Sequence, residues 1–188
     1  MNRRAALLLA TALAVGAGGA RAQTPSWTVD SAASSLGFRV LVDGSPLDGT
    51  FRRWDAQIAF DPAHPESARI EATIETGSAT TGDGTHAEAM PSSDWFAVKL
   101  FPRATFVSRR VRATGANSYV ADGDLTLRGV KRPAQLPFTL TVAGQVATAK
   151  GTLTLDRTAF GVGQGIFATG DMVDTKVTVT VALTARRS

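Results

Sequence analysis

GDLTLRGVKRP, residues 123–133, decides the fold together with the alternating run that follows it at 134–142. Leu125 and Leu127 fall on one face of an extended chain and polar side chains on the other, which is the pattern of a strand buried on one side. Gly129 permits a tight turn, after which the alternation is repeated by Leu136, Phe138, Leu140 and Val142. The stretch predicts a β-hairpin whose apolar face needs a second sheet or a closed barrel to cover it.

From Trp27 onward the rest of the chain reads as further short strands separated by Gly, Pro, Asp and Asn. Apolar and polar residues alternate cleanly at 69–74 and again at 177–181. We expect strands at about 27–29, 34–42, 49–60, 68–76, 105–114, 119–127, 134–142, 146–155 and 176–183. Many short strands at this spacing indicate an all-β fold, an antiparallel sandwich or barrel.

One long connection, residues 77–102, lacks the alternation. Residues 85–90 and 92–96 are predicted to form one or two short helices, with Ser93 as an N-cap. Within this connection Met90, Trp95 and Phe96 would present an apolar face. That face could lie across the mouth of a barrel or plug the end of its core, and the sequence leaves both arrangements open.

The first 22 residues have the features of a cleavable signal peptide. A basic start at 2–4 precedes an apolar run at 5–15, and Ala20-Arg21-Ala22 places small residues where a signal peptidase reads. The alternative, an uncleaved membrane anchor, is disfavoured because the run is well short of the roughly 20 residues of a spanning helix. We therefore expect a secreted, periplasmic domain at 23–188.

Composition excludes several classes of function. The precursor carries 20 basic and 16 acidic residues, but three arginines and no acid lie in the first 22 residues, so the mature chain is close to neutral and has no global attraction for nucleic acid. The chain has no cysteine, which excludes thiolate metal sites and thiol catalysis. Its two histidines, His64 and His86, have no paired metal-ligand spacing, and there is no G-x-S-x-G motif. We expect no catalytic site and no metal site.

The sequence is instead rich in large apolar side chains at strand positions. A barrel can fill its interior with them or keep a cavity for one slender ligand, and periodicity alone does not decide between the two. A filled barrel would make the chain an interaction protein, whereas an open one would make it a ligand carrier.

Ordered motifs along the whole mature chain resemble the YceI-like family of lipocalin-like periplasmic proteins described as polyisoprenoid-binding. The resemblance rests on Trp27-Thr28-Val29-Asp30, Gly49-Thr50-Phe51, residues 58–62, residues 74–82, Ser93-Asp94-Trp95-Phe96, Phe101-Pro102 with Thr105-Phe106, residues 123–130, and Arg157 with Phe160-Gly161-Val162. It implies an extended, eight-stranded antiparallel β-barrel with a long apolar interior, a short helical segment near one end, and often a homodimer.

The resemblance also implies a ligand, a long-chain isoprenoid such as a polyprenyl chain or a quinone tail, and no catalytic residue. Similar sequences with the 161–165 glycine run resemble a branch joined to a cytochrome b561-type membrane protein, so the alternative role is an envelope-stress or cytochrome b561-associated interaction protein. This chain departs from the family pattern at His86, Ala87 and Ala97. The residues we expect to line the apolar tunnel and its mouth are Phe38, Phe51, Phe60, Ile74, Met90, Trp95, Phe96, Phe106, Leu125 and Phe138.

Overall fold

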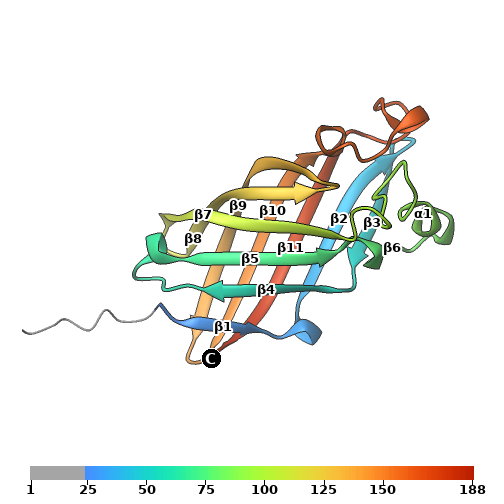
Figure 1. The fold of residues 1–188 in the computed structure, drawn as a ribbon. Helices are drawn as coiled ribbons and strands as arrows, with labels where there is room; N and C mark the ends of the chain where they lie inside the picture. Colours follow the sequence, from blue (N-terminus) through green and yellow to red (C-terminus); the bar gives the residue numbers. More distant parts are fainter. Residues whose placement is uncertain (1–23) are drawn as a thin grey trace, which may run out of the picture.

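A computed structural model describes residues 24–188, and the predicted signal peptide at 1–22 lies outside them. Within the described part, eleven strands make one antiparallel sheet (Figure 1). The strands are β1 (Ser26–Val29), β2 (Ser35–Val42), β3 (Ser45–Phe51), β4 (Trp54–Ala59), β5 (Arg69–Glu75), β6 (Ala79–Thr81), β7 (Arg103–Gly115), β8 (Ser118–Leu127), β9 (Val130–Ala143), β10 (Val146–Asp156) and β11 (Lys176–Arg187).

Eight of these strands close into a ring, in the order β1-β4-β5-β7-β8-β9-β10-β11, because β1 pairs with both β4 and β11. The last part of β11 pairs with β1 and its first part with β2, so β1 and β2 follow one another along the same edge. β3 and β6 continue the sheet beyond β2. The expectation of an extended, eight-stranded antiparallel barrel is confirmed.

The hairpin of β8 and β9 turns at Gly129, as predicted, and the turn has two residues, so β9 starts before the strand expected at 134–142. Leu127 pairs with Val130, and the turn residues Arg128 and Gly129 have φ values of 52° and 74°. Positive φ at both positions defines the turn type whose twist matches the flanking strands, and glycine adopts it without steric cost. Leu125 and Leu127 face the interior of the barrel, as the alternation requires.

The single strand predicted at 49–60 is wrong, because β3 ends at Phe51 and β4 starts at Trp54. The cause is Ser78, which is 4% exposed. Its carbonyl accepts the Arg52 amide at 3.1 Å and its hydroxyl accepts the Arg53 amide at 3.0 Å. Both amides bond to Ser78, so the chain bends there and changes neighbours.

The long connection contains one short helix, α1 (Gly84–Ala89), close to the helix predicted at 85–90. Its N-cap is Asp83, whose carboxylate accepts the His86 amide at 3.2 Å. The second predicted helix, capped by Ser93, is wrong. Residues 92–98 form turns instead, and Ala97 takes a φ of 47° while its amide donates to Ser92 O at 2.8 Å.

Several 3₁₀ turns complete the chain between the strands. They are η1 (Ser31–Ala33), η2 (Pro65–Ser67), η3 (Thr76–Ser78), η4 (Arg157–Phe160) and η5 (Gly165–Phe167). The loop after β10 and the helix α1 lie at the same end of the barrel, away from the C-terminus (Figure 1). None of the helices within residues 24–188 has the length and apolar character needed to cross a membrane.

Candidate functional site

The closed ring surrounds an inner cavity of about 230 Å³ whose walls are apolar side chains and Gly151. An aromatic cluster lies at the end of the barrel where β1 pairs with the last residues of β11, here called the aromatic end. The ring of Tyr119 stacks on Phe138 at 5.4 Å and meets Phe60 edge to face at 5.2 Å. Trp27 completes the cluster by donating from Nε1 to Phe60 O at 2.9 Å. Such walls favour hydrocarbon over water, because water needs polar partners in a cavity.

An outer cavity of about 370 Å³ lies between β2, β3, β11, α1 and the loop after β10. This volume falls in the range of about 300–1,000 Å³ that is typical of small-molecule sites. Most of its walls are apolar, but the lining also includes Asp43, Thr81, Thr85, His86 and Arg157. The outer cavity is therefore amphipathic, whereas the inner cavity is not.

The two cavities are neighbours, because the same side chains line both. The rings of Phe51 and Phe96 stand between the cavities with their centroids 5.8 Å apart, and Phe38 packs on Phe51 at 5.5 Å from the outer side. The residues shared by the two linings are Phe51, Phe96, Leu127, Leu155 and Val179. Aromatic and aliphatic side chains therefore separate the inner cavity from the outer one.

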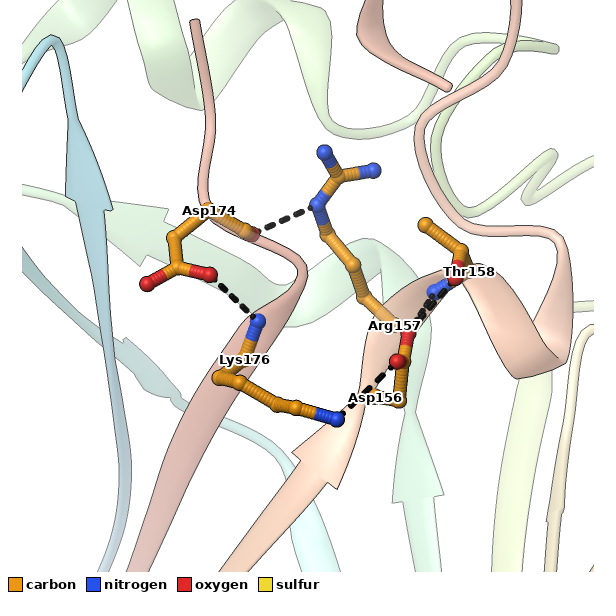
Figure 2. Close-up of polar contacts among 5 residues, drawn as sticks. All are labelled: Asp156, Arg157, Thr158, Asp174 and Lys176. Carbon is orange, nitrogen blue, oxygen red and sulfur yellow. Dashed lines mark hydrogen bonds and ion pairs between the residues drawn. The ribbon is translucent and has the colours of Figure 1, made fainter. Parts of the chain in front are cut away.

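The loop after β10 is held by one buried cation, Arg157, which is 4% exposed. Its Nε donates to Asp174 O at 2.9 Å (Figure 2), and its two Nη atoms reach further main-chain carbonyls between 2.6 and 3.3 Å. Those acceptors are Val162, Gly163, Phe167, Thr169 and Val173. A guanidinium has five N–H groups. The six carbonyl oxygens therefore engage all five, and two of the oxygens share one N–H group.

The surroundings of Arg157 explain how this buried cation is stable without a hydrogen bond to a carboxylate. Carbonyl dipoles replace its hydration, and its guanidinium carbon lies 5.6 Å from the centre of the Trp95 ring. Gly163 takes a φ of 77°, and a Cβ there would lie 2.1 Å from Nη1. Burial lowers the pKa of Arg157, opposed by the charges of Asp156 and Asp174. The residue remains a cation because an arginine pKa starts far above neutrality.

Asp156 fixes the start of this loop. Its carboxylate accepts from Thr158 Oγ1 at 2.6 Å and from Thr158 N at 3.0 Å, and Lys176 Nζ lies 3.1 Å away (Figure 2). The hydrogen bond from Thr158 and the contact with Lys176 lower the pKa of Asp156 from 3.8 to about 2. Asp174 Oδ1 accepts the Lys176 amide at 3.0 Å, so both ends of the loop are tied at β11.

The turn at 92–98 is tied to the β8–β9 hairpin. Arg128, in the tight turn, donates from Nη1 to Ser93 O and to Trp95 O. The turn that determines the hairpin register therefore also positions Trp95 and Phe96 at the cavities. This contact was not foreseen, because an arginine in a turn is usually solvated.

The structure brings all ten predicted tunnel residues to the two cavities. Phe60, Ile74, Phe106, Leu125 and Phe138 line the inner cavity, and Phe38, Met90 and Trp95 line the outer one. Phe51 and Phe96 line both. Contact with a ligand stays a prediction for each of them.

The prediction missed Arg157, Leu155 and the β11 valines Val177 and Val179 as lining residues. The alternation at 177–181 could have placed the valines inside. Nothing in the local sequence marks Arg157 as buried, because its six acceptors are main-chain carbonyls. Within residues 24–188 no cluster of His, Cys, Asp and Glu has the arrangement of a metal site.

The fold and its interior define a lipocalin-like β-barrel with an apolar core cavity and an amphipathic mouth. The model of the YceI-like domain matches residues 27–185, and the chain belongs to this family. A UPF0312 protein of Pseudomonas syringae pv. tomato is 33% identical over 156 residues, which is 80% of this chain and 78% of the relative.

Two solved structures are similar in fold. BcnA of Burkholderia cenocepacia aligns with a TM-score of 0.80 at 32% identity, covering 83% of this chain and 98% of BcnA. A polyisoprenoid binding domain from Saccharophagus degradans aligns with a TM-score of 0.67, covering 89% of this chain and 100% of that domain. At 17% identity, the second likeness concerns the fold alone.

Proposed function

We propose that this protein binds and carries a long-chain isoprenoid lipid, a polyprenyl chain or a quinone tail, without catalysing a reaction on it. It acts in the periplasm after removal of residues 1–22. The observation that carries the proposal is the pair of adjacent cavities, one apolar and one amphipathic, which share apolar side chains that include the rings of Phe51 and Phe96. An amphiphile fits this order, with its tail inside and its polar end at the mouth.

The energetics favour a long apolar tail. Each methylene group removed from water contributes about 0.8 kcal/mol to the free energy of binding. A tail that occupies both cavities therefore gains enough to offset its loss of translational, rotational and conformational entropy. The rings of Phe51 and Phe96 need to rotate to let the tail pass. Phe51 also contacts Phe38, so this passage couples the walls of both cavities.

Support for the ligand class also comes from the family, since a structural neighbour is a polyisoprenoid binding domain. Support for binding without catalysis comes from the character of the walls. The inner cavity is apolar, and the polar lining of the outer one consists of two threonines, one aspartate, one histidine and the hydrogen-bonded Arg157. General acid–base catalysis needs an acidic or basic side chain positioned within hydrogen-bond reach of the reacting group. The apolar walls of the inner cavity do not supply one.

The test is mass spectrometry of the protein expressed with residues 1–22 in a Gram-negative host and purified from the periplasm. We expect a native mass with a stoichiometric adduct of isoprenoid mass and a denatured mass of a chain that begins at Gln23. A clean ligand-free mass that is unchanged by incubation with polyprenols and quinones would contradict the carrier proposal and favour an interaction protein.

The substitution Leu125→Trp tests where the tail lies. Leu125 faces the inner cavity, so a tryptophan there fills space that the tail needs. The matched control is Val107→Trp, which adds the same side chain to an exposed site on β7. We expect L125W to lose most of its long-chain lipid and V107W to keep it. Equal lipid content in the two folded variants would place the ligand elsewhere.

A further inference from the structure

Within residues 24–188, the lining of the outer cavity includes one arginine, one histidine and no lysine. The arginine is Arg157, whose N–H groups are all taken by main-chain carbonyls. The histidine is His86, whose Nδ1 already lies 3.3 Å from Asp83 Oδ1. Asp43, also in the lining, is exposed and carries negative charge. Phosphate sites in proteins use arginine, lysine or free main-chain N–H groups to pair the anion.

The same mouth offers side chains that can hydrogen-bond to a ligand. The His86 ring lines the cavity, and its Nδ1 is buried without a hydrogen-bond partner, although it lies 3.3 Å from Asp83 Oδ1. Thr85 also lines the cavity with an exposed side chain. Thr81 is less available, since its hydroxyl donates to Asp83 O at 2.6 Å and accepts from Asp83 N at 3.2 Å.

A phosphate or diphosphate at this mouth would lose part of its hydration and meet a carboxylate instead of a cation. A buried or half-buried anion without a partner is unfavourable, and a like charge nearby makes it more so. An alcohol, a phenol or a quinone carbonyl has no such cost. It can hydrogen-bond to an imidazole nitrogen or a threonine hydroxyl.

We propose that the ligand's polar end is an uncharged hydrogen-bonding group, such as an alcohol, phenol or quinone carbonyl, that lies against Thr85 and His86. Phosphorylated isoprenoids bind less tightly, because the N–H groups of Arg157 are taken and Asp43 adds a negative charge to the lining. This inference rests on the proposed lipid-carrier function and specifies its ligand class. It predicts a protein that selects the head group by charge as well as holding the tail.

The experiment compares geranylgeraniol with geranylgeranyl diphosphate, which share one tail and differ in the head. Binding to the delipidated mature protein is measured for each by equilibrium dialysis at pH 7.5 and moderate salt, below the concentration at which either ligand aggregates. We expect the alcohol to bind at least tenfold more tightly. Equal or tighter binding of the diphosphate would overturn the head-group inference and leave the carrier function standing. Binding of neither ligand would overturn the carrier function and, with it, the head-group inference.

Matched variants at the mouth locate the head. Thr85→Lys adds a cation to the exposed first turn of α1, and Thr85→Met adds similar length without charge. We expect the ratio of the two affinities in T85K to lie about tenfold further toward the diphosphate than in T85M, because both variants lose the hydroxyl and only T85K gains a cation. The same ratio in T85K and T85M would mean that the head does not lie at this mouth.

His86→Phe separates hydrogen bonding from shape, since the aromatic ring is kept and both ring nitrogens are lost. We expect several-fold weaker binding of geranylgeraniol and no gain for the diphosphate. Unchanged binding of the alcohol by folded H86F protein would remove His86 from the head-group site.

Discussion

The two ends of the barrel are built by different means. The aromatic end is filled by side chains of the strand ring itself, where Trp27, Phe60, Tyr119 and Phe138 pack together. The mouth is built by connections whose main-chain carbonyls accept hydrogen bonds from Arg157 and Arg128. The aromatic end is therefore stabilised by apolar burial, and the mouth by a second apolar cluster, around Phe96 and Phe160, together with polar contacts to the backbone. This difference separates a tail site made by the strands from an entrance whose shape also depends on a few hydrogen bonds.

The largest effect on this comparison is expected from Phe106→Ala. Phe106 is 8% exposed and belongs to the apolar core cluster inside the barrel. Removing a buried phenylalanine costs about 3–5 kcal/mol. The matched variant is Phe51→Ala, at a half-buried ring that already borders two cavities, for which we expect less than half that loss.

Urea unfolding of the two variants provides the free energies. We also expect both to keep the fold and to retain lipid less well. Equal losses in F106A and F51A would mean that the barrel core is no better packed than the boundary between the two cavities. Unchanged lipid retention in folded F106A would remove Phe106 from the site.

The mouth is tested by Arg157→Met, which keeps a long side chain and removes every donor. Buried carbonyls left unpaired cost about 1–3 kcal/mol each when water cannot reach them. Part of the loop can hydrate, so we expect a loss of about 2–4 kcal/mol. Arg157→Lys, with a charge but only three N–H groups, should recover a fraction of it.

Hydrogen exchange locates the change. In R157M the amides of residues 162–175 should exchange faster than in the wild type. The amides of β7 and β8 should stay as protected as they are in the wild type. A loss below 1 kcal/mol, or faster exchange spread evenly over the barrel, would contradict a local role for Arg157.

A smaller effect is expected from Ser78→Ala, at the bend between β3 and β4. The Ser78 hydroxyl accepts the Arg53 amide and donates to Glu75 O at 2.7 Å. Its loss leaves groups unpaired at a buried site and should cost about 1–2 kcal/mol in urea unfolding. Thr80→Ala, on the neighbouring β6, serves as the control. Equal stability of S78A and the wild type would mean that the bend does not depend on this hydroxyl.

The smallest effect is the pH dependence from Asp156. Its pKa in the folded state is about 2, below the ordinary 3.8, so its contribution is present above pH 3.8 and is lost as the pH falls toward 2. The side chain is 35% exposed, so solvent screening reduces the contribution to about 1 kcal/mol. Asp156→Asn should lose this amount at pH 6 and match the wild type below pH 2. A difference that stays constant from pH 6 to pH 2 would contradict this assignment.

The strands of the barrel were predictable from the sequence and most of the mouth was not. Period-2 alternation placed Leu125, Phe138 and Ile74 in the interior, because a strand sends successive side chains to opposite faces. The turn at Gly129 followed from its need for positive φ. These signals are local, and they settle both the strands and the side of the sheet that is buried.

The mouth depends on contacts between residues far apart in the sequence. Ser78 bends the chain at Arg52, 26 positions earlier, and Arg128 holds Ser93 O and Trp95 O from the opposite hairpin. A pattern of polar and apolar residues carries no information on such pairs. For this reason the split of β3 from β4, the absence of a helix at 92–96 and the burial of Arg157 could not be foreseen.

The most direct test of the carrier account is a crystal structure of the protein purified from the periplasm, in a preparation whose native mass shows a lipid adduct. We predict continuous density for a chain that enters beside His86, passes the rings of Phe51 and Phe96, and ends near Phe138. A lipid bound only on the outer surface, with those rings closed and the inner cavity empty, would contradict the account.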